Sequence, residues 1–276
     1  MFEFLSNFFQ KNNIELFDAT PLSSCRIIKP YLLEREGFTD GTVIIFAVPY
    51  LTQEAFAPNR NVSSYAVSND YHLFFAELFN TLLPLLKATY PNHRFSGFAD
   101  HSPIDEVHAA ASAGLGVIGR NGLLITEKYS SYVFLGEIIT DARLEVFPKK
   151  VCCCEHCGKC DTICPSKISG NECLSSLTQK KGILKGAEEE YILRFQSAWG
   201  CDLCQEVCPH TAQALLKGSI FTPIAFFYNC VIPHLSSQMI ASMSERAFSE
   251  RAYAWRKQET LLRNLRLLEN SEKKGF

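Results

Sequence analysis

Clustered cysteines are the residues of this chain best suited to chemistry. The sequence has 276 residues and twelve cysteines, eleven of which follow residue 150. Most lie in two motifs, Cys154-x2-Cys157-x2-Cys160-x3-Cys164-Pro165 and Cys201-x2-Cys204-x3-Cys208-Pro209. Thiolates at two-residue spacing can wrap one iron–sulfur cubane, and a cysteine placed just before proline can reach a second one. The spacing therefore predicts two 4Fe–4S clusters and electron transfer.

The two motifs supply seven thiolates, whereas two cubanes need eight, and Cys173 is the expected eighth ligand. Cys152 and Cys153 compete with Cys154, but only Cys154 keeps the two-residue register. We expect one cluster to be held by Cys154, Cys157, Cys160 and Cys208, and the other by Cys164, Cys173, Cys201 and Cys204.

Zinc is the alternative metal for such a cysteine pattern. A zinc ribbon uses two C-x2-C knuckles and leaves no cysteine over, which does not suit three cysteines at successive two-residue gaps. A zinc-organised binding module would contain neither iron nor sulfide. Two cysteines outside the motifs, Cys25 and Cys230, are expected to be ordinary buried thiols.

Composition narrows the remaining possibilities. Apolar residues make up 47% of the chain and charged residues 20%, which excludes disorder, and the net charge is only −2. The start of the chain lacks the basic region of a signal peptide, and the apolar stretch near 224–235 is interrupted by Asn229 and Pro233. We therefore expect a cytoplasmic protein with no membrane partner.

Residues 1–150 mix predicted helices and strands. The periodicity predicts helices over 2–11, 70–90 and 103–113, and strands over 42–48, 94–99, 123–126 and 132–139. The helix over 70–90 should bury Phe74, Leu78, Leu82 and Leu85. Ser102 is expected to cap the helix that starts at Pro103, and Gly114 to end it. Beyond these residues, 151–212 is loop-rich and 213–276 is helical, most strongly over 244–269.

Six stretches of the chain carry a resemblance to a known family. They are SSYAVSNDYH (63–72), FADHSPIDEVHAAASAGLGVIGRNGLLI (98–125), FLGEIITD (134–141), CEHCGKCDTICP (154–165), CLSSLTQKKG (173–182) and WGCDLCQEVCPH (199–210). Together they resemble the epoxyqueuosine reductases, cobalamin-dependent iron–sulfur enzymes that complete queuosine synthesis in tRNA. The resemblance covers roughly residues 40–210, with a fainter match at LLRN (261–264).

The resemblance implies an α/β (α+β) protein of three parts. Residues 1–150 would form a nitroreductase-like domain that binds cobalamin and substrate. Residues 151–212 would form a bacterial two-cluster ferredoxin-like domain, and 213–276 a short helical tail. Typical members continue with helical repeats that help to hold the tRNA, so we expect a short form of the family without them.

The resemblance also implies a reaction, in which the epoxide of epoxyqueuosine becomes the cyclopentene of queuosine with loss of water. Electrons would pass through both clusters to cobalamin, and Asp100 matches the family's proton donor. The residues alone favour a helix N-cap or a loop carboxylate for Asp100, and it is the resemblance that favours the proton donor. The positions that match neighbours of cobalamin or of the inner cluster are Leu124, Leu135, Ser175, Cys201 and Asp202.

The expected partners are an electron donor protein and the anticodon loop of tRNA, the latter through Lys180 and Lys181. The C-terminal helix could add a phosphate-binding stripe of Arg246, Arg251, Arg256, Lys257, Arg263 and Arg266. The alternative is a solvated helix face paired with Glu250 and Glu259. Two rival functions remain open, which are a ferredoxin-type electron carrier and a diverged cobalamin-dependent reductase with a non-tRNA substrate.

Overall fold

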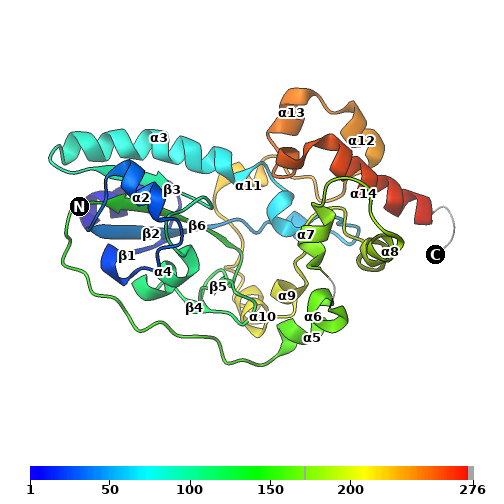
Figure 1. Ribbon diagram of the computed structural model, residues 1–276, viewed down its shortest axis with the longest axis horizontal. Helices are drawn as coiled ribbons and strands as arrows, with labels where there is room; N and C mark the ends of the chain where they lie inside the picture. The colour runs from blue at the N-terminus through cyan, green and yellow to red at the C-terminus, as the bar shows by residue number, and fades with distance from the viewer. Residues whose placement is uncertain (171, 273–276) are drawn as a thin grey trace. The chain divides into compact units, whose positions relative to one another are not determined.

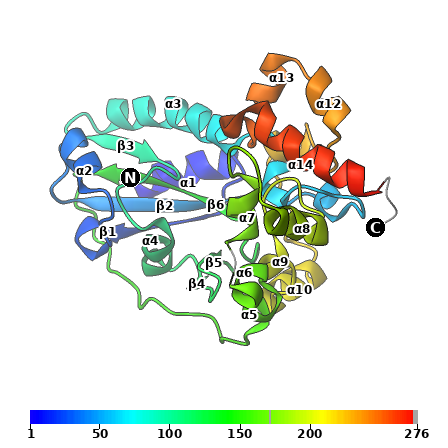
Figure 2. The same cartoon turned by 45° about the vertical axis from the view of Figure 1, so that its right-hand side comes forward.

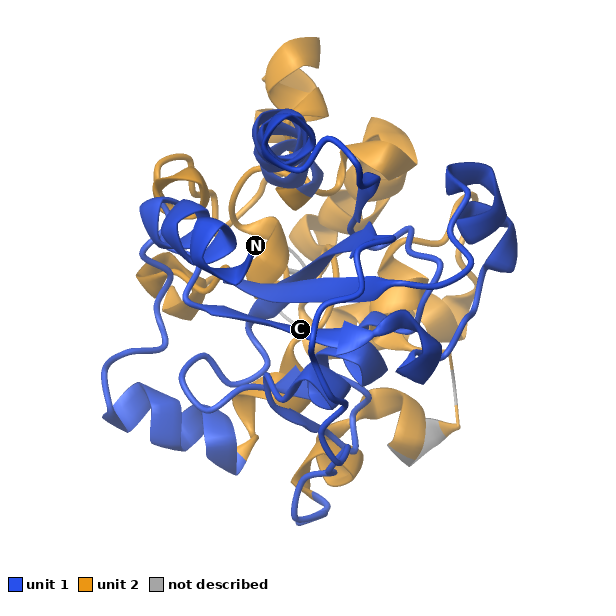
Figure 3. Cartoon of the chain, turned by 90° about the vertical axis from the view of Figure 1, so that its left-hand side faces the viewer, with its two compact units in different colours: residues 1–49, 72–158, 209–224 blue, residues 50–71, 159–208, 225–276 orange. Residues whose placement is uncertain are grey.

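The computed structural model describes residues 1–170 and 172–272, which form two compact units that alternate along the chain (Figure 3). The first unit consists of 1–49, 72–158 and 209–224, and the second of 50–71, 159–208 and 225–276. The sequence predicted three consecutive segments instead, and that division stays a prediction. Residues 273–276 of the predicted tail lie outside the described residues.

A four-stranded antiparallel sheet organises the first unit (Figure 1). Its strands, in spatial order, are β1 (Leu16–Pro21), β2 (Thr42–Pro49), β6 (Val133–Thr140) and β3 (Phe95–Phe98). The apolar run of β2 is buried at every position, as a central strand requires. A second pair is formed by β4 (Val117–Ile118) and β5 (Leu124–Ile125). The predicted strands are confirmed, with shifts of one or two residues at their ends.

Helices cover both faces of this sheet, with α3 (Tyr71–Thr89) on one face and α4 (Glu106–Ala113) on the other (Figures 1 and 2). On the α3 face, the Phe46 ring lies 5.9 Å from that of Phe75 and 4.8 Å from that of Phe9 in α1 (Phe2–Lys11). On the α4 face, Val43 and Ile45 of β2 pack against the alanines of α4. A short helix, α2 (Pro30–Glu36), precedes β2. The result is a mixed α/β unit, as expected.

The two long helices predicted for this unit are confirmed, but one residue predicted to be buried lies on the exposed side of its helix. α1 spans 2–11 and α3 spans 71–89, close to the predicted bounds. Within α3, Leu85 is 44% exposed, and Leu86 is buried in its place. The buried residues follow four-residue steps from Phe74 to Leu86. Because a helical turn has about 3.6 residues, the buried face rotates along α3 and leaves Leu85 outside it.

The start of α4 also differs from the prediction. The helix begins at Glu106, and its N-cap is Asp105, whose carboxylate accepts the His108 N–H at 3.0 Å. Ser102 accepts the Ile104 N–H instead, so 102–105 is a loop held by two side chains. Gly114 ends the helix as predicted, in a left-handed conformation with φ of 87°.

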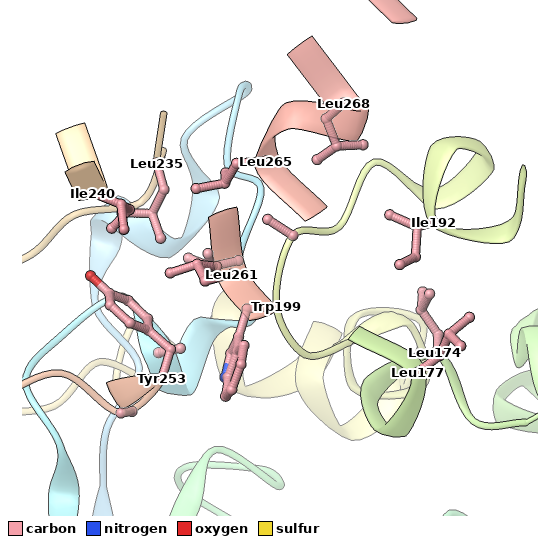
Figure 4. Close-up of a cluster of buried hydrophobic side chains, with 14 of the residues drawn as sticks. Leu174, Leu177, Ile192, Trp199, Leu235, Ile240, Tyr253, Leu261, Leu265 and Leu268 are labelled. Carbon is pink, nitrogen blue, oxygen red and sulfur yellow. The ribbon is translucent and has the colours of Figure 1, made fainter. Parts of the chain in front are cut away.

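Short helices surround one apolar core in the second unit (Figure 4). Trp199 is fully buried there, and its indole N–H donates to the Tyr65 hydroxyl at 2.8 Å. The helices of this unit are α5 (Lys159–Ile163), α6 (Pro165–Ser169), α7 (Leu174–Thr178), α8 (Gly186–Phe195), α9 (Leu203–Glu206), α11 (Ala225–Tyr228), α12 (Ser237–Ser242), α13 (Glu245–Ser249) and α14 (Lys257–Glu272). The helix α10 (Pro209–Leu216) belongs to the first unit. Among the described residues, none of the helices has the length and apolar character needed to cross a bilayer.

The predicted helix over 244–269 is interrupted between α13 and α14, and Arg251 is buried in the interruption. Its guanidinium donates to the Asn69 side chain at 2.7 Å and to the carbonyls of Cys230 and Val67 at 2.7 and 3.0 Å. An arginine that satisfies buried carbonyls cannot also bind phosphate. The prediction of Arg251 as part of a phosphate-binding stripe is therefore wrong.

Other members of the basic stripe also have partners within the second unit. Arg263 donates to the carbonyls of Lys180 and Gly182 at 2.7 and 2.6 Å. Arg246 pairs with Glu250 at 3.3 Å, one turn along the chain, as the alternative reading expected. These contacts favour a structural role for the C-terminal arginines.

Candidate functional site

Asp100 lies in the loop between β3 and α4, on the first unit. Its side chain is 66% exposed, and a carboxylate oxygen lies 3.6 Å from Nε2 of His72. Its backbone N–H donates to the Glu106 carboxylate at 3.0 Å. Because Asp105 caps α4, the N-cap reading of Asp100 is wrong. Asp100 is a loop residue, and its backbone N–H is held by the Glu106 carboxylate.

The backbone of Asp100 is left-handed, with φ of 65°. Aspartate adopts this region more readily than most residues, but the conformation still costs energy and persists where neighbours hold it. Here the Glu106 carboxylate accepts the amide and supplies that hold. The loop therefore holds the backbone of Asp100, and its carboxylate lies next to His72.

Two acidic side chains, which the sequence reasoning did not single out, lie beside this loop. Burial raises the pKa of Glu106 to about 6. Burial, and then the charge of Glu106, raise the pKa of Glu137 well above its ordinary value. A signal for Glu137 was present in the sequence, since this acid interrupts the apolar residues of FLGEIITD, where Ile138 and Ile139 follow it.

His101, the residue after Asp100, has its own partners. Its Nδ1 lies 3.2 Å from the Lys29 ammonium, and its Nε2 lies 3.3 Å from the Tyr31 hydroxyl. The histidine that lies beside the Asp100 carboxylate is therefore His72, although His101 is the neighbour in the chain.

The eight predicted cluster cysteines divide between the two units. Cys154 and Cys157 belong to the first unit, and the other six belong to the second. Within the second unit, α5, which carries Cys160, packs beside α9, which carries Cys204. All twelve cysteines are free thiols. The structure thus brings parts of the two motifs together.

Cys201 lies among other predicted ligands. Its pKa is raised to about 12, chiefly by burial and then by the charges of Asp202, Cys204 and Cys173. Three of the four thiols predicted for one cluster are therefore electrostatic neighbours. No three His, Cys, Asp or Glu side chains within 1–170 and 172–272 are grouped so that they could hold a metal ion.

Backbone amides point at two of these sulfurs. The Arg120 N–H donates to Sγ of Cys154 at 3.3 Å, and the Leu203 amide donates to Cys201. Such N–H···S bonds stabilise thiolate charge and tune iron–sulfur clusters. The donor set, which combines soft sulfurs with amide hydrogen bonds, suits a cluster.

The remaining cysteines and lysines give mixed outcomes. Cys25 is largely buried, and its pKa is raised to about 12 by burial and then by the charge of Glu137. Cys230 is exposed, so its prediction as a buried thiol was wrong. Lys180 forms an ion pair with Glu188 at 2.5 Å, whereas Lys181 is exposed.

The residues expected near cobalamin come from both units. Leu124 is buried in β5, and Leu135 is half-buried in β6. The Ser175 hydroxyl of α7 accepts a hydrogen bond from the side-chain amide of Gln179 at 3.2 Å. Nothing in these contacts tests a corrin site, and the five assignments stay predictions.

The Asp202 side chain forms hydrogen bonds and an ion pair with residues of its own unit. The side chain is buried, and its carboxylate accepts the Ser64 amide at 2.6 Å and the Ser64 hydroxyl at 2.9 Å. It also accepts the Ser63 hydroxyl and pairs with Arg60 at 2.7 Å. Asp202 therefore ties the loop 60–64 to the second cysteine motif. A cavity of about 190 Å³ lies beside it and is also lined by Cys201.

Comparison with known proteins gives one consistent relationship. No family model matches the chain. The sequence is 36% identical over 186 residues to an epoxyqueuosine reductase of Gloeobacter violaceus, covering 63% of this chain and 57% of that protein. It is also 36% identical over 159 residues to the epoxyqueuosine reductase of Pseudomonas aeruginosa, covering 54% of this chain and 43% of that protein. The chain thus spans about half the length of the curated relatives it matches.

Solved structures agree at the level of the fold. Epoxyqueuosine reductase from Streptococcus thermophilus superposes with a TM-score of 0.74 at 22% identity, covering 97% of this chain and 80% of that one. An epoxyqueuosine reductase crystallised with an epoxyqueuosine-modified tRNA stem loop gives a TM-score of 0.73 at 22% identity, covering 96% of this chain and 80% of that one. In sequence over about half of their length, and in fold, this chain is similar to the epoxyqueuosine reductases.

Proposed function

We propose that this protein is an oxidoreductase of queuosine biosynthesis that reduces the epoxide of epoxyqueuosine in tRNA, giving queuosine and water. The observation that carries the proposal is the 36% identity over 186 residues to a curated epoxyqueuosine reductase. The exposed carboxylate of Asp100 and the thiol-rich motifs of the same chain suit that chemistry. The partners would be tRNA and a reduced electron donor protein, and the compartment would be the cytoplasm.

Two 4Fe–4S clusters and cobalamin are the proposed cofactors. Cys154, Cys157, Cys160 and Cys208 would ligate one cluster, and Cys164, Cys173, Cys201 and Cys204 the other. Leu124, Leu135, Ser175, Cys201 and Asp202 would lie near the corrin or the inner cluster. When bound, these groups would supply low-potential electrons to the epoxide carbon.

Asp100 would act as the general acid of the reaction. Opening an epoxide leaves charge on oxygen, and a protonated carboxyl group beside that oxygen neutralises it. The left-handed loop and the Glu106 contact hold Asp100 in place, and its exposure leaves the carboxyl group open to a substrate. His72, 3.6 Å away, could exchange a proton with it.

A direct test uses the anaerobically reconstituted protein with cobalamin, a chemical reductant and epoxyqueuosine-containing tRNA. We expect mass spectrometry of the digested tRNA to show conversion of epoxyqueuosine to queuosine. Cobalamin binding without conversion would favour a reductase with another substrate. Absence of cobalamin binding, with both clusters present, would favour a ferredoxin-type carrier.

A smaller substrate is the second candidate, and one observation favours it. Arg251 and Arg263 of the basic C-terminal region bind backbone carbonyls of their own unit and are not available to phosphate. Conversion of the free epoxyqueuosine nucleoside at the same rate as the tRNA would support this candidate.

Removing one predicted cluster ligand should halve the iron content. Cys164→Ser is expected to lose roughly four irons per chain, because one cubane lacks a thiolate. Cys230→Ser is the matched control, since Cys230 is exposed and outside both motifs. Iron and acid-labile sulfide would be measured in both variants. Equal iron in the two variants would contradict the ligand assignment.

Lys181 should contribute to tRNA affinity. This lysine is exposed, and it lies in the segment CLSSLTQKKG, which in the resembled family approaches the anticodon loop of the tRNA. We expect Lys181→Ala to weaken binding of modified and unmodified tRNA alike, and to reduce the slope of log K against log salt by about 1. Lys11→Ala, an exposed lysine of α1, is the control. An unchanged salt slope in Lys181→Ala would contradict this role.

A further inference from the structure

The side chain of Glu137 is an unusual feature of the sheet in the first unit. It is fully buried in the central strand β6, and neither carboxyl oxygen has a hydrogen-bond partner of normal geometry within the described residues. In the antiparallel register, Glu137 lies opposite Ile45 of β2 and Phe98 of β3, so it points to the face covered by α4. Burial strongly disfavours an ionised carboxylate that has no opposite charge beside it, so the group must hold a proton or share one.

Glu106, at the start of α4, is the acid that interacts with Glu137. The charge of Glu106 is the largest cause, after burial, of the raised pKa of Glu137. Two carboxyl groups in one low-dielectric site cannot both ionise, so the pair holds one proton and one negative charge. Glu137 has no exposed surface and Glu106 is less buried, so the proton belongs on Glu137 and the charge on Glu106.

The charged member of the pair contacts Asp100. The Glu106 carboxylate accepts the Asp100 N–H at 3.0 Å, and that amide belongs to a left-handed residue. Hydrogen bonds to an ionised acceptor are stronger than neutral ones. The ionised form of Glu106 therefore holds the Asp100 amide more strongly than the neutral form would.

We infer that Glu106 and Glu137 form a proton-sharing carboxyl pair that positions Asp100. This inference rests on the proposed function of Asp100 as the general acid. Glu106 and Glu137 are positioning residues in this account, because neither needs to touch the substrate. Beyond the pair itself, the groups that act on it are Asp100, Ser102, Lys29 and Cys25. The residues directly opposite Glu137 are Ile45 of β2 and Phe98 of β3, and Ser96 of β3 lies on the same face of the sheet.

The sign of the pH dependence follows from the geometry. Glu106 is ionised only above its pKa of about 6, so its hold on Asp100 should strengthen as the pH rises through that value. The turnover number kcat should therefore show a rising limb near pH 6, while KM changes little. Glu106→Gln keeps an acceptor for the Asp100 amide but cannot ionise, and should lose this limb.

Infrared spectroscopy tests the pair without any turnover. A buried protonated carboxyl group gives a C=O stretch separate from that of ionised carboxylates. We expect the reconstituted protein at neutral pH to show this band, Glu137→Gln to lose it, and Glu106→Gln to retain it. Absence of the band from the wild type, or its persistence in Glu137→Gln, would overturn the inference.

Turnover in paired variants tests the positioning role. Glu137→Gln keeps a donor for Glu106, so kcat should stay within about threefold of wild type, whereas Glu137→Leu should lower it at least tenfold. Equal kcat in these two variants, or a rising limb near pH 6 that persists in Glu106→Gln, would overturn the inference. If the wild type reduces no epoxyqueuosine, the proposed function fails, and the infrared band still decides whether the carboxyl pair exists.

Discussion

Replacing Asp100 with asparagine is expected to lower kcat about 10²- to 10⁴-fold, the usual contribution of a positioned general acid. Asparagine has the same shape as aspartate and also tolerates a left-handed backbone, so the loop and the Glu106 contact should survive. The variant cannot release a proton to the epoxide oxygen. Turnover of epoxyqueuosine tRNA would be measured beside a cobalamin titration, which should match the wild type.

Asp105→Asn provides the matched control for this substitution. Asp105 belongs to the same loop, but it caps α4 through His108 and pairs only weakly with Arg26 at 3.8 Å. Asparagine is an equally good N-cap, so Asp105→Asn should retain wild-type activity. If Asp100→Asn turns over as fast as Asp105→Asn, Asp100 is not the proton donor.

Replacing Asp202 with alanine is expected to destabilise the second unit by about 3–5 kcal/mol. The substitution removes the buried one of the two carboxylate partners of Arg60, whose side chain is only 16% exposed, and leaves the Ser64 amide and hydroxyl without their acceptor. Each of these groups is costly to bury alone. Urea unfolding followed by pulse proteolysis under anaerobic conditions would measure the change.

Glu206→Ala is the control for Asp202, because Glu206 pairs with the same arginine at 2.5 Å but is 38% exposed. An exposed pair contributes about 0–1 kcal/mol, so this variant should unfold near the wild-type midpoint. Equal stability of Asp202→Ala and Glu206→Ala would contradict the structural role of Asp202. Iron analysis of both variants would separate this role from loss of a cluster.

Helices, strands and helix ends that depend on residues close together in the chain could be predicted from the sequence. The apolar run of β2, the amphipathic α1 and the glycine that ends α4 all follow from residues close together in the chain. The cysteine motifs could be found for the same reason, since two- and three-residue gaps are local. The start of α4 was wrong because Ser102 and Asp105 both suit a cap, and tertiary contacts decide between them.

Long-range contacts explain what could not be predicted. Arg60 and Asp202 are 142 residues apart, and nothing near either residue indicates the other. Arg251 has the sequence surroundings of a surface arginine, yet carbonyls from separate segments bury it. Glu106 and Glu137 likewise meet only because α4 covers the face of the sheet to which β6 contributes Glu137.

The iron and acid-labile sulfide content of the anaerobically reconstituted protein tests the central claim most directly. Eight cysteine ligands for two cubanes predict about eight irons and eight sulfides per chain, with absorbance that bleaches on reduction. A colourless protein, or one that holds four irons or fewer at full reconstitution, would contradict the account.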